Sequence, residues 1–302
     1  MVEGQEQYAM PAGDAFEVEG RSNPWGGIVR IFAENRFAVL GLAIIVLIVL
    51  FSFVGPLIYR TNQIDTNLLQ ANLPPSSAHP LGTDPTGYDV LGRLMVGGQS
   101  TLKIGFAAAI LSSLWGTAWG AVSGYLGGWI DALMMRVVDS ALAIPPLLLL
   151  LLLASFIVPT VPVLIVVIGM ISWLVGARLV RGECLSLRTR EYVQAAKMFG
   201  ARPPRLIVRH IVPNLLGVVV VQTTFQVANA ILLLANLSFL GLGPPAPSTN
   251  WGEMLNSGLN FMYEGYWWLI YPAGIAIIAT VVAFNLVGDA LRDALDVRLQ
   301  ER

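Results

Sequence analysis

The sequence predicts an all-α, polytopic membrane protein with six transmembrane helices. Hydrophobic residues make up 55% of the 302-residue chain and charged residues only 12%, about half of the charged share that soluble domains carry. Uncharged runs long enough to cross about 30 Å of hydrocarbon recur along the chain. Most basic residues lie between these runs rather than within them. Together these observations indicate an integral membrane protein.

A polar N-terminal stretch precedes the first crossing. Residues 1–36 are expected to form a cytosolic tail that ends in an interfacial helix, with Trp25 at the headgroup level. Residues 37–302 then form the transmembrane domain.

Uncharged runs define the crossings of this domain. The expected spans are residues 37–58, 104–130, two tight crossings within 140–177, 215–240 and 265–288. The paired crossings are expected to break near the prolines of residues 158–162, and Pro145-Pro146 should kink the first of them or delay its start. Residues 131–139 are expected to form a charged turn.

The loops differ in charge, and this difference sets the orientation. The first, third and fifth loops carry only Arg60, Arg93 and Lys103, whereas the tails and the even loops carry the other fifteen Lys and Arg residues. Basic loops stay on the cytosolic side of a membrane. Both termini are therefore expected in the cytosol, with an outer segment at residues 60–103 and an outer loop at residues 241–266.

The most basic part of the chain is the loop of residues 178–214, which holds eight of the eighteen Lys and Arg residues. A short helix is expected to end at Gly200, because glycine accepts the left-handed conformation that closes helices. Pro203 then fits the first turn of a new helix. Because Ala195 and Ala196 are small, a partner can approach the first helix closely. Such an elbow suits the docking of another protein on the cytosolic side.

The residues that usually carry chemistry are sparse. His79 and His210 lie on opposite sides of the expected topology, so no metal site built on a His pair is expected. The chain has no G-x-x-x-x-G-K-[ST] phosphate loop, so it is not expected to hydrolyse nucleotide. No catalytic residue, cofactor or nucleic-acid partner is expected. Cys184, the single cysteine, should react with thiol reagents from the cytosolic side once any covering partner is removed.

Two classes of function fit such a chain. The first is a passive translocation subunit of an ATP-driven transporter, and the second is an ion-coupled carrier or an intramembrane enzyme. The second class usually keeps ionisable groups at membrane depth. No acid lies in the middle of any expected crossing, which favours an energy source outside this chain.

The fifth expected crossing carries a stripe of amide side chains. They are Gln222, Gln226, Asn229 and Asn236. At about 100° per residue, the four fall within roughly an 80° arc of one helix face. Amides in lipid are costly unless they meet a partner or water. Two interpretations remain open: the stripe bonds across helices as structural glue, or it lines an aqueous pathway that offers weak, neutral contacts to cargo.

The loop of residues 178–214 resembles a motif of the membrane subunits of binding-protein-dependent ABC importers. That motif reads E-A-A, three residues, Gly, and then Pro thirteen residues after the Gly. Here it is Gln194-Ala195-Ala196, Gly200 and Pro213. The departure is Gln194 in the place of Glu, and Glu191 lies three positions earlier. The resemblance implies that these residues form the docking site for an ATPase subunit.

Three further stretches resemble the peptide/nickel branch of this family in its C-type subunit. The first is HPLGTD (residues 79–84) with Gly87-Tyr88-Asp89 and Arg93, where Tyr88 replaces a common Arg. The second is LSFLGLG (residues 237–243) with Trp251-Gly252, and the third is NLVGD (residues 285–289) with LRD (residues 291–293). The resemblance makes four residues candidates for contact with a binding protein at the outer face: Asp84, Asp89, Arg93 and Trp251. Structural hydrogen bonding is the alternative for the first three.

The resemblance also implies a multi-subunit system in the plasma (inner) membrane of a bacterium or archaeon. A homologous second permease subunit would share the pathway within the lipid bilayer. Two cytosolic ATPase subunits would bind ATP and Mg, and an extracytoplasmic substrate-binding protein would deliver cargo. The implied cargo is di- or oligopeptides, with nickel complexes, glutathione or haem as alternatives.

Overall fold

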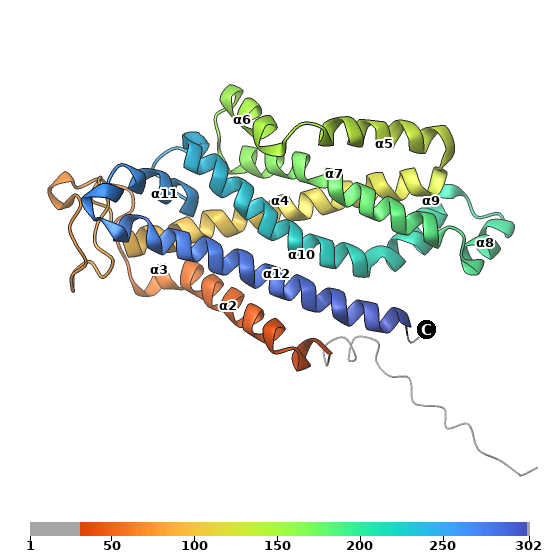
Figure 1. Cartoon of the computed structure of the whole chain (residues 1–302), viewed down its shortest axis with the longest axis horizontal. Helices are drawn as coiled ribbons and strands as arrows, with labels where there is room; N and C mark the ends of the chain where they lie inside the picture. Colours follow the sequence, from red (N-terminus) through yellow and green to blue (C-terminus); the bar gives the residue numbers. More distant parts are fainter. Residues whose placement is uncertain (1–30, 301–302) are drawn as a thin grey trace, which may run out of the picture.

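A bundle of long helices forms the molecule, as the computed structural model of residues 31–300 shows (Figure 1). The principal helices are α2 (Arg36–Phe53), α3 (Gly55–Ile58), α4 (Val90–Leu126), α5 (Gly128–Leu142), α6 (Pro146–Phe156), α7 (Val161–Leu187), α8 (Glu191–Met198), α9 (Pro203–Leu206), α10 (Val212–Leu237), α11 (Trp251–Leu259) and α12 (Tyr271–Gln300). The expected tail lies outside the described residues except for residues 31–36. Of these, residues 31–34 are helical, Asn35 caps α2, and Arg36 is the first residue of α2.

Five helical stretches of the described chain are long and apolar enough to cross a membrane. Helices α5 and α6 form a sixth span if the pair is taken together, although they meet at an angle of 81°. The predicted all-α, polytopic membrane fold is thus confirmed. The bend lies between Leu142 and Pro146, where Pro145-Pro146 was expected to kink the helix or delay its start. The break expected near residues 158–162 is also present, because α6 ends at Phe156 and α7 begins at Val161.

Helix α4 begins earlier than the sequence predicts. The second crossing was expected from residue 104, but the helix starts at Val90 and runs for 37 residues, about 55 Å at 1.5 Å per residue. Asp89 caps its first turn by accepting a hydrogen bond from Gly92 N at 2.8 Å. The sequence did not predict this early start, because Arg93 and Lys103 interrupt the uncharged run. The last 14 residues of the outer segment, 90–103, are therefore part of α4.

The charged turn expected at residues 131–139 is helical and belongs to α5. Its acids are compatible with a helix because each one pairs with an arginine of α7. Asp131 contacts Arg181, and Asp139 contacts Arg178. We refer to residues 178–214 as the coupling loop. Arg178 and Arg181, the first two basic residues of this loop, therefore hold α5 against α7.

Helices α4 and α7 pack closely because small residues line their contact. A Cβ atom at Gly116 would lie 2.9 Å from Trp173 O, and one at Gly124 would lie 2.8 Å from Cys184 Cβ. Cys184 is fully buried and donates its S–H to Ala121 O at 3.4 Å. The expectation that thiol reagents reach Cys184 after removal of a partner was wrong, because this chain's own helices cover it.

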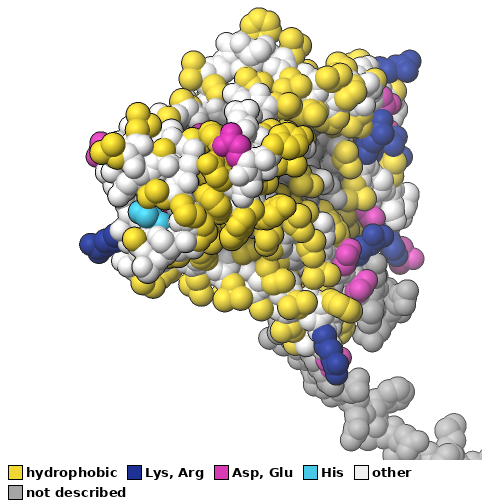
Figure 2. Space-filling model, turned by 60° about the vertical axis from the view of Figure 1, so that its left-hand side comes forward, with side chains coloured by type: hydrophobic (Ala, Val, Ile, Leu, Met, Phe, Trp, Pro, Cys, Tyr) yellow, Lys and Arg dark blue, Asp and Glu magenta, His cyan; other side chains and the backbone are white. Residues whose placement is uncertain are grey.

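The two ends of the bundle differ in character. Helices α8 and α9 lie at one end together with the C-terminal part of α12, whereas α11 and the loops before α4 lie at the other (Figure 1). Hydrophobic side chains cover most of the flank between the ends, and the Lys and Arg side chains in view gather mainly toward the α8 end (Figure 2). An apolar flank between polar ends is the pattern of a membrane-spanning bundle.

Candidate functional site

The helix α8 forms the predicted elbow of the coupling loop. Phe199 N donates to Ala195 O at 3.0 Å, and Ala201 N donates to Ala196 O at 3.1 Å, so the chain closes the helix as expected. Gly200 has a φ of +83°, the left-handed conformation that glycine accepts without strain. Helix α9 starts at Pro203 directly after this turn.

Gln194 ties α8 to the preceding helix. Its Nε2 donates to Arg188 O at 2.8 Å, which satisfies a carbonyl at the C-terminal end of α7. Val193 is the buried residue of α8, whereas Glu191 and Ala195 are exposed. Gln194 thus holds the elbow to α7 by a neutral hydrogen bond, which a glutamate could not donate.

The tip of the elbow carries two exposed apolar side chains that the sequence reasoning missed. Met198 is 88% exposed and Phe199 is 92% exposed. No other part of the described chain covers these two side chains. The signal in the sequence was an apolar pair placed directly before the helix-closing Gly200. Pro213, the last residue of the predicted motif, is exposed in the first turn of α10.

The amide stripe of α10 divides into an internal and an external part. Gln226 is buried, and its Nε2 donates to Ser112 Oγ on α4 at 3.0 Å and to Ser172 O on α7. Gln222 is half-buried and lines a cavity of about 10 Å³ with Gln226. Asn229 and Asn236 are exposed on the surface of the chain. Gln226 therefore holds three helices together, whereas the two asparagines face whatever surrounds the chain.

At the other end, Asp84 organises the turn before α4. Its Oδ1 accepts hydrogen bonds from Thr86 N at 2.8 Å, Thr86 Oγ1 at 2.7 Å and Tyr88 N at 3.0 Å. Its Oδ2 lies 3.8 Å from Arg93 Nε. These contacts make Asp84 a structural residue of the turn.

Asp89 joins three parts of the outer segment. Besides capping α4, its Oδ2 accepts from Tyr59 Oη at 2.9 Å and lies 2.9 Å from His79 Nδ1. The pKa of Tyr59 is raised to about 12, mainly by burial and to a smaller extent by the hydrogen bond to Asp89. The phenol therefore stays protonated at neutral pH and keeps donating to Asp89.

Arg93 and Trp251 connect the outer segment to α11 and to the loop before it. Arg93 Nη1 donates to Pro247 O at 2.9 Å, and its guanidinium lies 4.2 Å from the centroid of the Tyr88 ring. Trp251 is 1% exposed, and its Nε1 donates to Leu94 O at 2.9 Å. An outward contact through Trp251, which we expected from the sequence, does not fit this position, because the indole is part of the core.

The described residues offer no metal centre. No group of three or more His, Cys, Asp or Glu side chains that could hold a metal ion occurs in residues 31–295. The features that stand out are the exposed elbow of α8 at one end, a polar outer segment at the other, and amides between them.

Comparison with known proteins identifies the family. Residues 116–301, more than half of the chain, match the family described as binding-protein-dependent transport system inner membrane component. The chain belongs to this permease family. Residues 23–75 match a second family, the N-terminal TM domain of oligopeptide transport permease C. The permease is thus a C-type subunit of the peptide branch, as the sequence motifs indicated.

Similar permeases are found across bacteria. The chain is 42% identical over 297 residues to the oligopeptide transport system permease protein OppC of Bacillus subtilis, covering 98% of this chain and 97% of the relative. It is 42% identical over 285 residues to OppC of Escherichia coli K12, covering 94% of each chain. It is 36% identical over 278 residues to the dipeptide transport system permease protein DppC of Alkalihalophilus pseudofirmus, covering 92% and 91%.

These relatives are permease subunits of ABC transporters, which are non-catalytic membrane components. This permease is accordingly a non-catalytic, multi-pass membrane subunit of a transporter complex. The absence of a nucleotide-binding loop from the sequence agrees with that role.

Proposed function

We propose that this permease forms part of the translocation pathway of an ATP-driven importer of di- and oligopeptides. The observation that carries the proposal is the exposed elbow of α8, which lies at the opposite end of the bundle from the outer segment (Figure 1). Relatives of nearly full-length coverage are named for oligopeptide and dipeptide transport, and this supports a peptide cargo over nickel complexes, glutathione or haem.

The elbow would couple ATPase motion to the pathway. Met198 and Phe199 provide an apolar knob of the kind that fills a pocket of a partner. Movement of α8 would reach α7 through the hydrogen bond between Gln194 and Arg188. It would reach α10 through α9, because a continuous helical stretch runs from Pro203 to Leu242. The two helices that bracket the coupling loop would therefore move with α8.

The external amides would face the pathway or the second permease subunit. Asn229 and Asn236 are exposed although they belong to an apolar span. Exposed amides are unfavourable against lipid, so this face would meet polar partners or water. Neutral donors and acceptors would allow peptide groups to pass without tight binding. Gln226 would act as glue, because its amide group is already occupied by α4 and α7.

The proposal includes the other subunits and the orientation. A homologous permease subunit would complete the pathway, two cytosolic ATPase subunits would bind ATP and Mg, and an extracytoplasmic binding protein would deliver cargo at the outer face. The coupling loop and both termini would lie in the cytosol, because the basic residues concentrate there.

Disulfide or bifunctional cross-linking at the elbow tests the coupling. A cysteine introduced by Phe199→Cys should cross-link to an ATPase subunit in the assembled transporter, and native Cys184 should not compete because it is fully buried. A cysteine at Tyr263, 95% exposed in the loop after α11, is the control and should give no such product. Cross-linking at Tyr263 but not at Phe199 would overturn the proposed orientation. Mass spectrometry of cargo that co-purifies with the complex tests the peptide assignment.

A further inference from the structure

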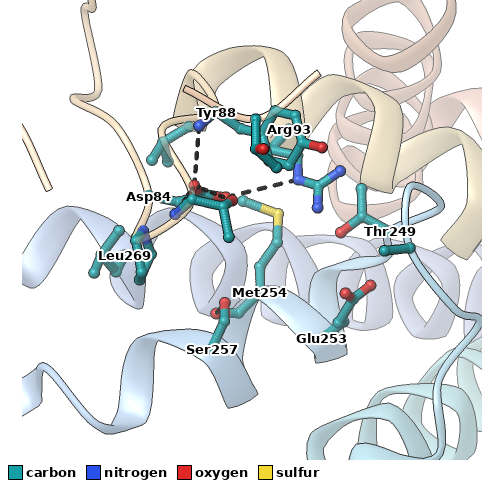
Figure 3. Close-up of a pocket in the computed structure, with 13 residues that line it drawn as sticks. Asp84, Tyr88, Arg93, Thr249, Glu253, Met254, Ser257 and Leu269 are labelled. Atoms are coloured by element: carbon teal, nitrogen blue, oxygen red, sulfur yellow. Dashed lines mark hydrogen bonds and ion pairs between the residues drawn. The ribbon is translucent and has the colours of Figure 1, made fainter. Parts of the chain in front are cut away.

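A cavity of about 220 Å³ lies between the outer segment and α11. Figure 3 shows side chains from the turn before α4, from the first turn of α4 and from α11 converging on it. Thr86, Ala246 and Ser257 line the cavity and are exposed, so it opens to the surface of the molecule. The volume is below the roughly 300–1,000 Å³ typical of drug-sized ligands, which suits a single side chain or an amino-acid-sized group.

The charges that line the cavity do not cancel. Asp84 is paired with Arg93, and the guanidinium of Arg93 is engaged by Pro247 O and by the Tyr88 ring. Glu253 is the second carboxyl group of the wall. Desolvation raises the pKa of this carboxyl group, although Arg93, Thr249 and Asn250 partly stabilise its charged form. Its Oε2 is buried from solvent and has no hydrogen-bond partner. When Asp84 and Glu253 are both ionised, the two carboxylates outnumber the guanidinium of Arg93, so the cavity wall carries a net charge of −1.

The rest of the wall is apolar. Val90, Met254 and Leu269 are buried residues that line the cavity beside Tyr88. A ligand with a positively charged head and an aliphatic stem would match both the negative and the apolar part of the wall. Long charged side chains pack their methylene groups against apolar surfaces while the charged head contacts a polar partner.

We propose that this cavity is a binding site for a primary ammonium group on an aliphatic stem, as in a lysine side chain or the amino terminus of a peptide. Glu253 holds the ammonium, and the apolar wall takes the stem. The site is separate from α8 and from the amide stripe, and it does not depend on the cargo of the transporter.

Other ligand classes fit less well. An anion would be repelled by the carboxylate of Glu253. Arg93 would not attract it strongly, because this side chain is only 7% exposed and already donates to Pro247 O. A bare metal ion would find two carboxylates beside a guanidinium, not a cluster of three ligands. A guanidinium binds a carboxylate best through both oxygens, but Glu253 Oε2 is closed off. An ammonium is a compact charge that needs one accessible oxygen.

Charge-selective labelling at the rim tests the site in the assembled transporter. Ser257→Cys places a thiol beside the cavity, and Cys184 is buried and silent. The quantity to measure is the ratio of two labelling rates, that of the aminoethyl methanethiosulfonate cation over that of neutral ethyl methanethiosulfonate. This ratio should be higher for the introduced thiol than for a free thiol in solution. The expected preference is about fivefold, the factor for attraction between unit charges about 4 Å apart in water. Glu253→Gln should remove it, whereas Glu264→Gln, an exposed carboxylate outside the cavity, should leave it intact.

Protection of the same thiol distinguishes the sources of the ammonium. Nα-acetyl-lysine amide presents only the side-chain ammonium, alanine amide presents only an α-ammonium, and Nα-acetyl-norleucine amide presents neither. Slower labelling with either amine, lost in Glu253→Gln, supports the site and names its source. Equal protection by the norleucine compound, or a labelling preference that survives Glu253→Gln, overturns the proposal. If Ser257→Cys prevents assembly, saturation-transfer NMR on the parent complex replaces the labelling experiment. Butylamine should give a saturation-transfer signal and butanol should not. Signals of equal size from the two compounds would refute the site.

Discussion

Arg181 on α7 and Asp131 on α5 form a two-point ion pair, with 2.6 Å from Nε to Oδ1 and 2.6 Å from Nη2 to Oδ2. Ser123 Oγ of α4 donates to the same carboxylate at 2.5 Å. Seven residues further along, Arg188 Nη1 donates to Gly124 O of α4 at 3.1 Å. Because α7 leads directly into α8, this set of contacts fixes where the elbow of α8 stands relative to α4 and α5.

Removing the guanidinium of Arg181 should destabilise the permease. Arg181→Met leaves Asp131, 11% exposed, without its main partner, and losing hydrogen bonds to a charged group costs about 1.5–3 kcal/mol. The melting temperature of the purified complex in detergent should fall. Arg178→Met is the matched control, since Arg178 and Asp139 are each 51% exposed and such surface pairs contribute about 0–1 kcal/mol. Equal losses in the two variants would contradict the structural role of Arg181.

Gly200 should tolerate no β-branched residue without loss of transport. Its φ of +83° is strained for Val, although nothing crowds the position within 4 Å. Gly200→Val should insert and assemble but reduce ATP-driven uptake, because the elbow can no longer close α8 in the same way. Gly182→Val is the control: Gly182 also has open space but lies within α7 at an ordinary helical φ. Undiminished uptake by Gly200→Val would refute the proposed coupling through α8.

The two parts of the amide stripe should respond differently to the same change. Gln226→Leu removes the bonds to Ser112 and Ser172, so the complex should lose thermal stability, by about 1–3 kcal/mol for the polar groups left unsatisfied. Asn229→Leu should assemble normally but alter uptake or cargo preference, because Asn229 is exposed. Gel filtration and peptide uptake separate these outcomes. If Asn229→Leu alone abolishes assembly, this asparagine is an interface residue rather than a pathway residue.

Glu253 should make the stability of the outer end depend on pH. Its carboxyl pKa is raised by burial in the fold, so the unfolded chain ionises first as the pH rises, and stability is lost as the pH passes through the raised value. Without ligand, Glu253→Gln should therefore melt at a higher temperature than the parent at pH 7. The gain should vanish below about pH 4, where Glu is protonated in both states. The exposed Glu264→Gln should show no such difference, and a gain of equal size at both pH values would contradict the burial effect.

Local signals in the sequence predicted much of this architecture. The Gly200 turn, the start of α9 at Pro203 and the delayed start of α6 at Pro146 follow from backbone preferences of single residues, and the structure confirms them. Apolar runs long enough to cross a bilayer predicted the long helices. The length of such a run can be read from the sequence without knowing which helices pack against one another.

The errors arose where a distant residue decides. Arg93 and Asp131 looked like loop residues, but Pro247 and Arg181 satisfy their charges from 154 and 50 positions away. Gln226 and Asn229 looked alike on one stripe and differ only because α4 and α7 reach the first. Trp251 looked like a surface aromatic and is a core residue. A single sequence does not reveal such pairings, because they depend on how the helices pack.

Reconstituted transport tests the central claim most directly. Proteoliposomes with this permease, its partner permease and the ATPase subunits, supplied with the binding protein, should accumulate a labelled oligopeptide only when ATP is present. Uptake should fall when Gly200→Val replaces the parent chain and persist with Gly182→Val. Accumulation driven by an ion gradient without ATP, or the absence of ATP-dependent peptide uptake from a fully assembled complex, would contradict the account.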